Sequence, residues 1–147
     1  MTLSHGHDVN AILRAARTDA AGRALANPGA DLLVNGLYDA LTASSGTTAR
    51  WEYTVPAGCA AILEGLYLYV QWATTAGQVL ARVDVNRAGA GYGTFAEIEN
   101  DTVQNRHLTV SASLLLRAGD QVRGVTNNGD PGVKLMRVNA YLRQITL

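Results

Sequence analysis

The chain has 147 residues, with 12 Lys and Arg residues against 12 Asp and Glu residues, and only 16% of its residues are charged. Ordinary soluble domains carry about 25% charged residues, so the surface of this protein is unusually neutral. Zero net charge removes the attraction that provides most nucleic-acid affinity, and we therefore expect no nucleic-acid partner. Weak repulsion between copies favours association instead.

The first 30 residues differ in pattern from the rest of the chain. Asp8 is a suitable N-cap, and the apolar residues after it recur at spacings of three and four, which predicts a thin amphipathic helix over residues 9–25. Gly22 and a stripe made mostly of alanine weaken such a helix, so an extended arm is the alternative. In either form, residues 1–30 are expected to serve attachment or assembly, through the apolar side chains of Leu3, Val9, Ile12 and Leu13.

The sequence shows neither a secretion signal nor a membrane-spanning stretch. Residues 1–7 contain neither the positive nor the apolar region of a secretion signal, so we expect a soluble protein made in a cytoplasm. The longest mainly apolar stretch, residues 60–73, is shorter than the roughly 20 residues that a membrane span needs. We therefore expect no membrane partner.

From residue 31 onward the apolar residues recur with a period of two, which is typical of strands. We expect strands over residues 32–39, 50–55, 60–73, 79–86, 93–99, 107–116, 121–126 and 133–145. Turn-forming clusters separate them at residues 43–48, 56–58, 74–77, 87–93, 118–120 and 127–132. About eight strands without helical patterns between them predict an all-β fold, an antiparallel β-sandwich of the jelly-roll type over residues 31–147.

One strand carries an unusual charged residue. The stretch 60–73 has apolar residues on both faces, which predicts a central strand or an interface strand. In regular alternation, Glu64 shares a face with Ile62, Leu66 and Leu68. Because a buried carboxylate is costly unless it is paired, we expect Glu64 to have an arginine partner, in the same subunit or across a subunit boundary.

No catalytic constellation is recognisable in the sequence. His5 and His7 lack a third metal ligand, and no serine stands in a G-x-S-x-G motif. The glycine-rich residues 87–93 do not match a phosphate-binding loop, and we expect a contact loop that carries Tyr92. We therefore predict no enzymatic activity, no metal and no cofactor.

Three further groups have a structural interpretation that we prefer. Glu97 and Glu99 share a strand face at a spacing that a glycosidase could use, but a solvated face or a subunit contact is the better reading. Residues 127–132 are expected to form a tight turn rather than a calcium loop. Cys59, the single cysteine, is expected to be a small buried side chain.

Two turns carry a resemblance to a known class of proteins. Residues 51–58 read WEYTVPAG and residues 116–122 read LRAGDQV. A strand that ends in TVPAG, an apolar strand soon after it and a later L-x-AGD-x-V turn resemble the small jelly-roll structural proteins of tailed-phage virions. These include head decoration proteins, head fibres and the related trimeric tumour-necrosis-factor-like sandwiches. The resemblance spans residues 31–147.

This resemblance implies a non-enzymatic protein located in the virion, usually a homotrimer, that clamps capsid subunits or projects from them. Its expected partners are further copies of itself and the major capsid protein or other virion proteins. The leading hypothesis is thus a capsid decoration protein that stabilises the phage head. For its contacts with other subunits we single out Glu64, Tyr67, Tyr69, Trp72 and Tyr92.

Two alternatives are open to the same fold class. In a receptor-binding or carbohydrate-binding fibre or tail sandwich, Trp72, Tyr92 or Tyr67 would stack on sugars. A cupin-like enzyme would need a cluster of His and Glu metal ligands on its strands, whereas His107 is the one histidine outside the N-terminal tail.

Overall fold

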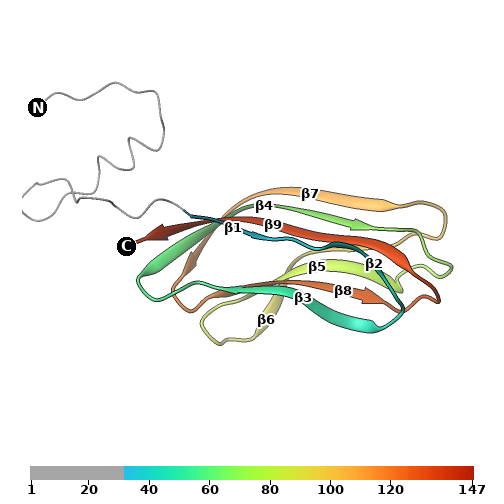
Figure 1. The fold of residues 1–147 in the computed structure, drawn as a ribbon, viewed down its shortest axis with the longest axis horizontal. Helices are drawn as coiled ribbons and strands as arrows, with labels where there is room; N and C mark the ends of the chain where they lie inside the picture. Colours follow the sequence, from blue (N-terminus) through green and yellow to red (C-terminus); the bar gives the residue numbers. More distant parts are fainter. Residues whose placement is uncertain (1–31) are drawn as a thin grey trace, which may run out of the picture.

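The computed structural model describes residues 32–147. The predicted helix or arm, with Leu3, Val9, Ile12 and Leu13, lies outside the described residues. The described part consists of nine strands joined by turns and loops (Figure 1). The strands are β1 (Leu32–Gly36), β2 (Asp39–Thr42), β3 (Gly46–Thr54), β4 (Cys59–Val70), β5 (Val79–Asn86), β6 (Tyr92–Glu99), β7 (Arg106–Arg117), β8 (Gln121–Asn128) and β9 (Lys134–Thr146). Within residues 32–147 there is no helix that could cross a membrane.

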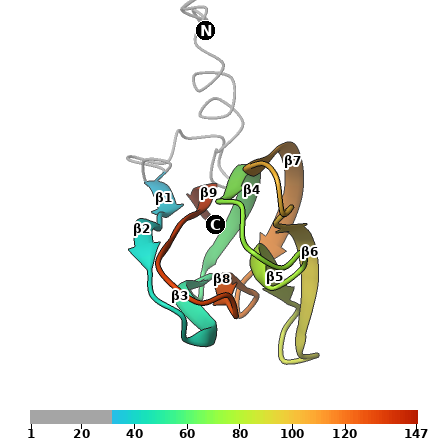
Figure 2. The same ribbon diagram turned by 90° about the vertical axis from the view of Figure 1, so that its right-hand side faces the viewer.

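The strands form two antiparallel sheets that pack face to face (Figure 2). The first sheet has the order β1-β9-β4-β7, with β2 also paired to β9, and the second sheet has the order β3-β8-β5-β6. Strands β1 and β2 pair with successive parts of β9, so together they act as one edge strand interrupted at residues 37–38. Counted in this way, the sandwich has eight strands in a jelly-roll order, which confirms the predicted fold class.

The predicted strand limits differ from the structure at several ends. Strand β3 begins at Gly46 instead of Arg50, and β4 ends at Val70 instead of Ala73. Strand β8 continues through Asn128, which we had assigned to a turn. The Asn128 side chain is buried and donates hydrogen bonds to the carbonyl oxygens of residues 42 and 132, at 2.8 and 3.0 Å. Asparagine is common in turns, but the side chain of Asn128 instead holds two other chain segments to the end of β8.

The core lies between the inner faces of the two sheets, and small and branched side chains fill it. The completely or nearly completely buried side chains with the largest volumes are Leu63, Leu66, Leu68, Leu116, Met136, Leu142, Val55, Val70, Val79, Val83, Val122 and Val125. Cys59 belongs to the same buried cluster, as expected. Aromatic residues are few on the inner faces, and two of them connect the sheets.

The indole ring of Trp51 crosses from one sheet to the other. Trp51 belongs to β3, and its Nε1–H donates a 2.8 Å hydrogen bond to the carbonyl oxygen of Val138 in β9. The ring packs directly on Gly36 of β1 and Gly124 of β8, because a Cβ atom at either position would lie 2.4 Å from ring atoms. Two glycines in opposite sheets thus make the space for one tryptophan.

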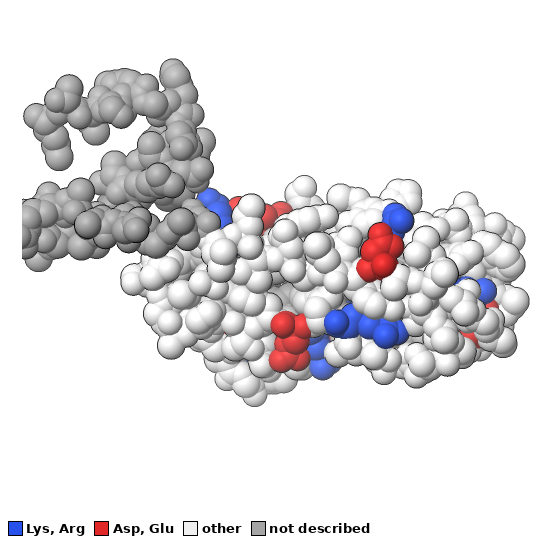
Figure 3. Space-filling view, viewed as in Figure 1, with Lys and Arg blue, Asp and Glu red and all other residues white. Residues whose placement is uncertain are grey.

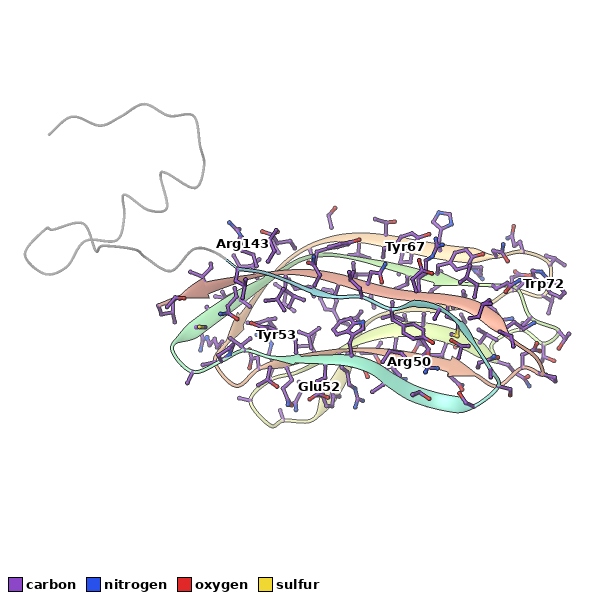
Figure 4. All side chains as sticks on the ribbon, viewed as in Figure 1. Arg50, Glu52, Tyr53, Tyr67, Trp72 and Arg143 are labelled. Carbon is purple, nitrogen blue, oxygen red and sulfur yellow. The ribbon has the colours of Figure 1, made fainter. Side chains whose placement is uncertain are left out.

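Tyr53 forms a second link between the sheets, two residues along β3. Its hydroxyl donates a 2.8 Å hydrogen bond to Oε1 of Gln144 in β9, and Figure 4 shows its side chain between the two layers. Burial raises the pKa of Tyr53. Trp51 and Tyr53, both partly buried, share the inner face of β3 with the buried Val55 just after the strand, as the alternation predicted.

The two turns that carry the virion resemblance lie side by side. The backbone N–H of Val55 donates to the carbonyl oxygen of Asp120 at 2.9 Å, and the N–H of Gly119 donates to the carbonyl oxygen of Val55, also at 2.9 Å. The TVPAG turn and the AGD turn are therefore joined through their main chains, although more than 60 residues separate them.

The carboxylate of Asp120 fixes a third loop to this pair of turns. It accepts hydrogen bonds from the N–H of Arg117 at 2.9 Å, the N–H of Ala88 at 3.0 Å and Nη1 of Arg87 at 2.8 Å. Burial alone would raise the pKa of Asp120, but the hydrogen bonds from Arg117, Arg87 and Ala88 outweigh it and lower the pKa. Residues 87–91, which connect β5 to β6, are thus anchored by a buried charge.

The glycine at position 124 gives a test of the link through Trp51. We expect Gly124→Ala to lower the free energy of unfolding by about 1–3 kcal/mol, because the new methyl group forces the indole ring out of its place. The matched control is Gly93→Ala, since a Cβ at Gly93 would find its nearest neighbour at an ordinary 3.9 Å. Urea unfolding of both variants measures the difference. Equal stability of the two variants would contradict the proposed packing.

The Asp120 anchor predicts a dependence of stability on pH. Because the folded state lowers the pKa of Asp120, its contribution is present above the unfolded value of about 4 and is lost as the pH falls through the folded pKa. We expect Asp120→Asn to be less stable than the parent at pH 7, with a difference that shrinks towards pH 2. Urea unfolding at a series of pH values measures this difference, and a constant gap would refute the role of the charge.

Candidate interaction face

The large apolar side chains that the described residues leave exposed are unevenly distributed. Six of them lie on the first sheet or at the interruption of its edge strand: Leu32, Leu33, Leu37, Leu41, Leu115 and Tyr141. The strands of the second sheet contribute one, Phe95, and the other four lie in connections or at the C-terminus: Trp72, Val103, Val133 and Leu147. Exposed apolar groups that gather on one face are typical of interaction surfaces.

We call the outer side of the first sheet the leucine–tyrosine face. It is defined by the outward side chains Leu33, Leu41, Tyr67, Tyr69, Leu115, Leu135 and Tyr141, which alternate along their strands with inward residues. The strand pairing sets them in rows across the sheet. One row reads Leu33, Arg143, Ile62, Leu115, and another pairs Leu41 with Leu135. Leucine side chains therefore lie at both edges of the face, on β1 and β2 at one edge and on β7 at the other.

The middle of the face combines bulky and small side chains. Tyr141 of β9 stands opposite Gly65 of β4, which in turn stands opposite Ser111 of β7. In the next row, Tyr67 stands opposite Thr109. A stripe of tyrosines on β9 and β4 thus runs beside a stripe of small hydroxyl side chains on β7. The face has a raised half and a lower half.

Two acidic and two basic groups of this face pair with each other within the chain. Arg137 Nε lies 2.9 Å from the carboxylate of Asp39, and the guanidinium also lies over the ring of Tyr69 at 5.4 Å. Figure 3 shows the side of the molecule along the edge strands, where most of the surface is uncharged and acidic and basic groups touch one another. The ion pairs leave the leucine–tyrosine face with little net field of its own.

Glu64 lies on this face because of a break in the alternation of β4. Relative to β9 it is the extra residue of a β-bulge between Leu63 and Gly65, where the pairing register shifts. After the bulge, Leu66 and Leu68 point inward while Glu64 points outward and is 41% exposed. The predicted face shared with Ile62 is thus confirmed, but the face shared with Leu66 and Leu68 is wrong, and so is the predicted burial. A bulge adds one residue and inverts every later position.

The predicted arginine partner of Glu64 is confirmed. Nε of Arg143, in the neighbouring strand β9, lies 2.8 Å from Oε1 of Glu64. Both residues belong to the same chain, and Figure 4 shows Arg143 and Tyr67 on the same side of the sandwich. Glu64, Tyr67 and Tyr69 thus lie together on the leucine–tyrosine face. Their role in subunit contact stays a prediction.

The structure separates the other two residues that we singled out. Trp72 follows β4 at one end of the sandwich, 45% exposed, with Nζ of Lys134 at 5.1 Å from its ring (Figure 4). Tyr92 was assigned to a loop but is the first residue of β6 in the second sheet. No single surface therefore brings together Trp72, Tyr92 and Tyr67, the aromatic residues of the sugar-binding alternative.

The second sheet has a charged outer face with internal pairing. Asp84 points outward and is nevertheless buried, because Nε of Arg82 and two nitrogens of Arg123 hold its carboxylate at 3.1 Å. The Arg123 guanidinium also covers the ring of Tyr92 at 3.7 Å, and burial and the neighbouring Glu52 carboxylate raise the pKa of Tyr92. The Asp84 carboxylate, the Arg123 guanidinium and the Tyr92 ring are thus engaged with one another.

An open groove lies where β6 and β7, the edges of the two sheets, meet. It has a volume of about 380 Å³ and is lined by Glu97, Ile98, Glu99, Arg106, His107 and Leu108. Glu97 also interacts with Arg82 at 3.6 Å. Within residues 32–147 no three His, Cys, Asp or Glu side chains are close enough together to hold a metal ion.

The turn that we weighed as a calcium loop is held by its own side chains. The Asp130 carboxylate is fully buried, accepts hydrogen bonds from the N–H and hydroxyl of Thr74, and lies 2.9 Å from Nζ of Lys134. The hydrogen bonds from Thr74, followed by the charge of Lys134, lower the pKa of Asp130. Its oxygens are thus engaged in the tight turn that we predicted.

Leu33, Leu41 and Tyr141 belong to the face but were not predicted from the sequence. A signal for Leu115 was present, because it occupies the outward series of β7 that otherwise contains His107, Thr109 and serines. For the other three, the inward and outward positions depend on which strand pairs with β9, and the sequence does not indicate that partner.

Comparison with known proteins does not assign a family. No model of a known protein family and no curated protein matches the chain. The solved structures that it resembles include a protein of Bacillus endospore appendages, described as disulfide-linked pili, with 15% identity over 84% of this chain and 96% of that chain and a TM-score of 0.37. A pentameric capsid protein from metagenomic phage sequences has 18% identity, coverages of 70% and 59%, and a TM-score of 0.38.

A third similar structure is that of infectious bursal disease virus, Gx strain, with 7% identity over 81% of this chain and 33% of that chain and a TM-score of 0.38. The chain thus spans about a third of the length of that protein and less than two thirds of the phage capsid protein. All these TM-scores are below 0.5, so the likenesses carry no argument about function.

The exposed ion pair on the face gives a further test. We expect Glu64→Ala to change the free energy of unfolding of the single, unassociated chain by less than about 1 kcal/mol, because solvent screens a pair in which the carboxylate is 41% exposed. Urea unfolding at concentrations below association measures this change. A loss of several kcal/mol in the single chain would contradict the prediction, whereas a larger loss that appears only where the chain associates would mean that another subunit covers Glu64.

Proposed function

We propose that this protein is a non-enzymatic structural component of a phage virion, a capsid decoration protein that assembles with further copies of itself and stabilises the head. The single observation that supports this most is the leucine–tyrosine face. It exposes leucine and tyrosine side chains, its ion pairs are internal, and it covers the length of one sheet. Such a surface suits contact with another protein better than contact with a small molecule.

The joined turns support the resemblance on which the virion part of the proposal rests. The TVPAG and AGD motifs meet through the hydrogen bonds between Val55, Gly119 and Asp120. In the virion proteins that the chain resembles, contacts across the boundaries of capsid subunits stabilise the shell against the pressure of the packaged DNA. We propose the same role here, with the major capsid protein as partner.

The carbohydrate-binding alternative has less support from the geometry. Arg123 covers the Tyr92 ring, and Trp72 and Tyr67 lie at different places on the sandwich. An exposed aromatic ring with polar groups around it is needed for sugar stacking, and these three residues do not form one such site.

Co-sedimentation with empty heads tests the proposed function. The heads are assembled from the major capsid protein encoded in the same genome, and the full-length chain is added. We expect saturable binding and a higher melting temperature of the decorated heads. A chain that stays in the supernatant would refute the decoration role, and binding on a glycan array would favour the alternative.

A further inference from the structure

We propose that a second copy of this chain covers the leucine–tyrosine face. The inference rests on the proposed function in one respect, namely that the protein works in an assembly. It adds which surface is buried and which partner buries it. Three observations on this face support a second copy: its area, its relief and its charge.

The area of the face matches a standard protein interface. Four adjacent strands spaced by about 4.8 Å give a width of about 19 Å, and the 12 residues of β4 give a length of about 40 Å. The face therefore offers roughly 760 Å², where stable interfaces use about 800 Å² on each partner. One sheet face is thus large enough for a stable pair, without the loops or the second sheet.

The relief of the face complements itself. The tyrosine stripe with Tyr141 and Tyr67 lies beside the low stripe with Ser111 and Thr109. When two identical faces meet about a two-fold axis, the tyrosines of each copy lie over the hydroxyl side chains of the other. Gly65 deepens the low part next to Tyr141, because it has no side chain. A flat or uniformly bulky face would not pack against its own copy in this way.

The charge of the face does not oppose a second copy. Like charges on identical faces normally repel, but Asp39 and Glu64 are neutralised by Arg137 and Arg143 of the same chain. Interfaces are enriched in arginine and depleted in lysine. The two basic residues of these pairs are arginines, and Lys134, the only lysine of the protein, is buried against Asp130. Burial of the four groups of the two pairs on the face therefore leaves each of them with a partner of opposite charge.

The mass of the protein in solution, measured by light scattering over a range of concentrations, tests the inference. We expect the full-length chain to have a multiple of 15.6 kDa. Leu41→Glu and Tyr141→Glu each place a charge on the face and should weaken association at least about 100-fold, towards a single chain. Both residues are exposed in the single chain, 70% and 44%, so circular dichroism should show folded variants.

The matched control is Phe95→Glu, which places the same charge on the exposed side of the second sheet, where Phe95 is 39% exposed. Its mass should equal that of the parent. A parent chain of 15.6 kDa at all concentrations would overturn the inference, as would face variants that keep the parent mass or a control that dissociates as they do.

Head binding separates this inference from the proposed function. A chain that is a single copy in solution but co-sediments with heads keeps the decoration role and overturns the self-contact. A chain that forms oligomers through this face but does not bind heads supports the self-contact and refutes the decoration role.

Discussion

The contact of Trp51 with Gly36 and Gly124 is the constraint on which the rest of the structure depends. The indole ring spans the space between the sheets, and its hydrogen bond to Val138 fixes the ring in place. Because β9 is held in this way, β1, β2 and β4 pair with it in defined registers. Those registers decide which side chains fill the core and which are left on the outer face.

Most of the charged residues that the structure describes, within residues 32–147, are paired with one another. Asp84, Asp120 and Asp130 are buried and each has a basic partner, and Asp39 and Glu64 are paired on the surface. Buried carboxylates hold loops and strand ends where a small core could not. This use of charge explains why a neutral composition leads to a neutral outer surface, which is the physical condition for close contact between subunits.

Pattern and turn chemistry predicted most of the strands but not the irregularities within them. Strand β5 has the predicted limits, because Val79, Ala81, Val83 and Val85 recur at every second position of its sequence. Glu64 shows the opposite case. Its arginine partner followed from the cost of a buried charge, but its face and exposure did not, since the bulge depends on pairing with β7 and β9 at the same time. The local sequence does not indicate which strands pair or in which register.

The sequence by itself determined the fold class, the small-residue core and the neutral surface, because these follow from composition and from a period of two along each strand. Only the tertiary structure decided that the interrupted strand β1–β2 lies beside β9, and that Leu33, Leu41, Leu115 and Tyr141 share one face with Tyr67 and Tyr69. The reason is that strand order and register arise from contacts between distant segments, such as Trp51 with Gly36 and Val55 with Asp120.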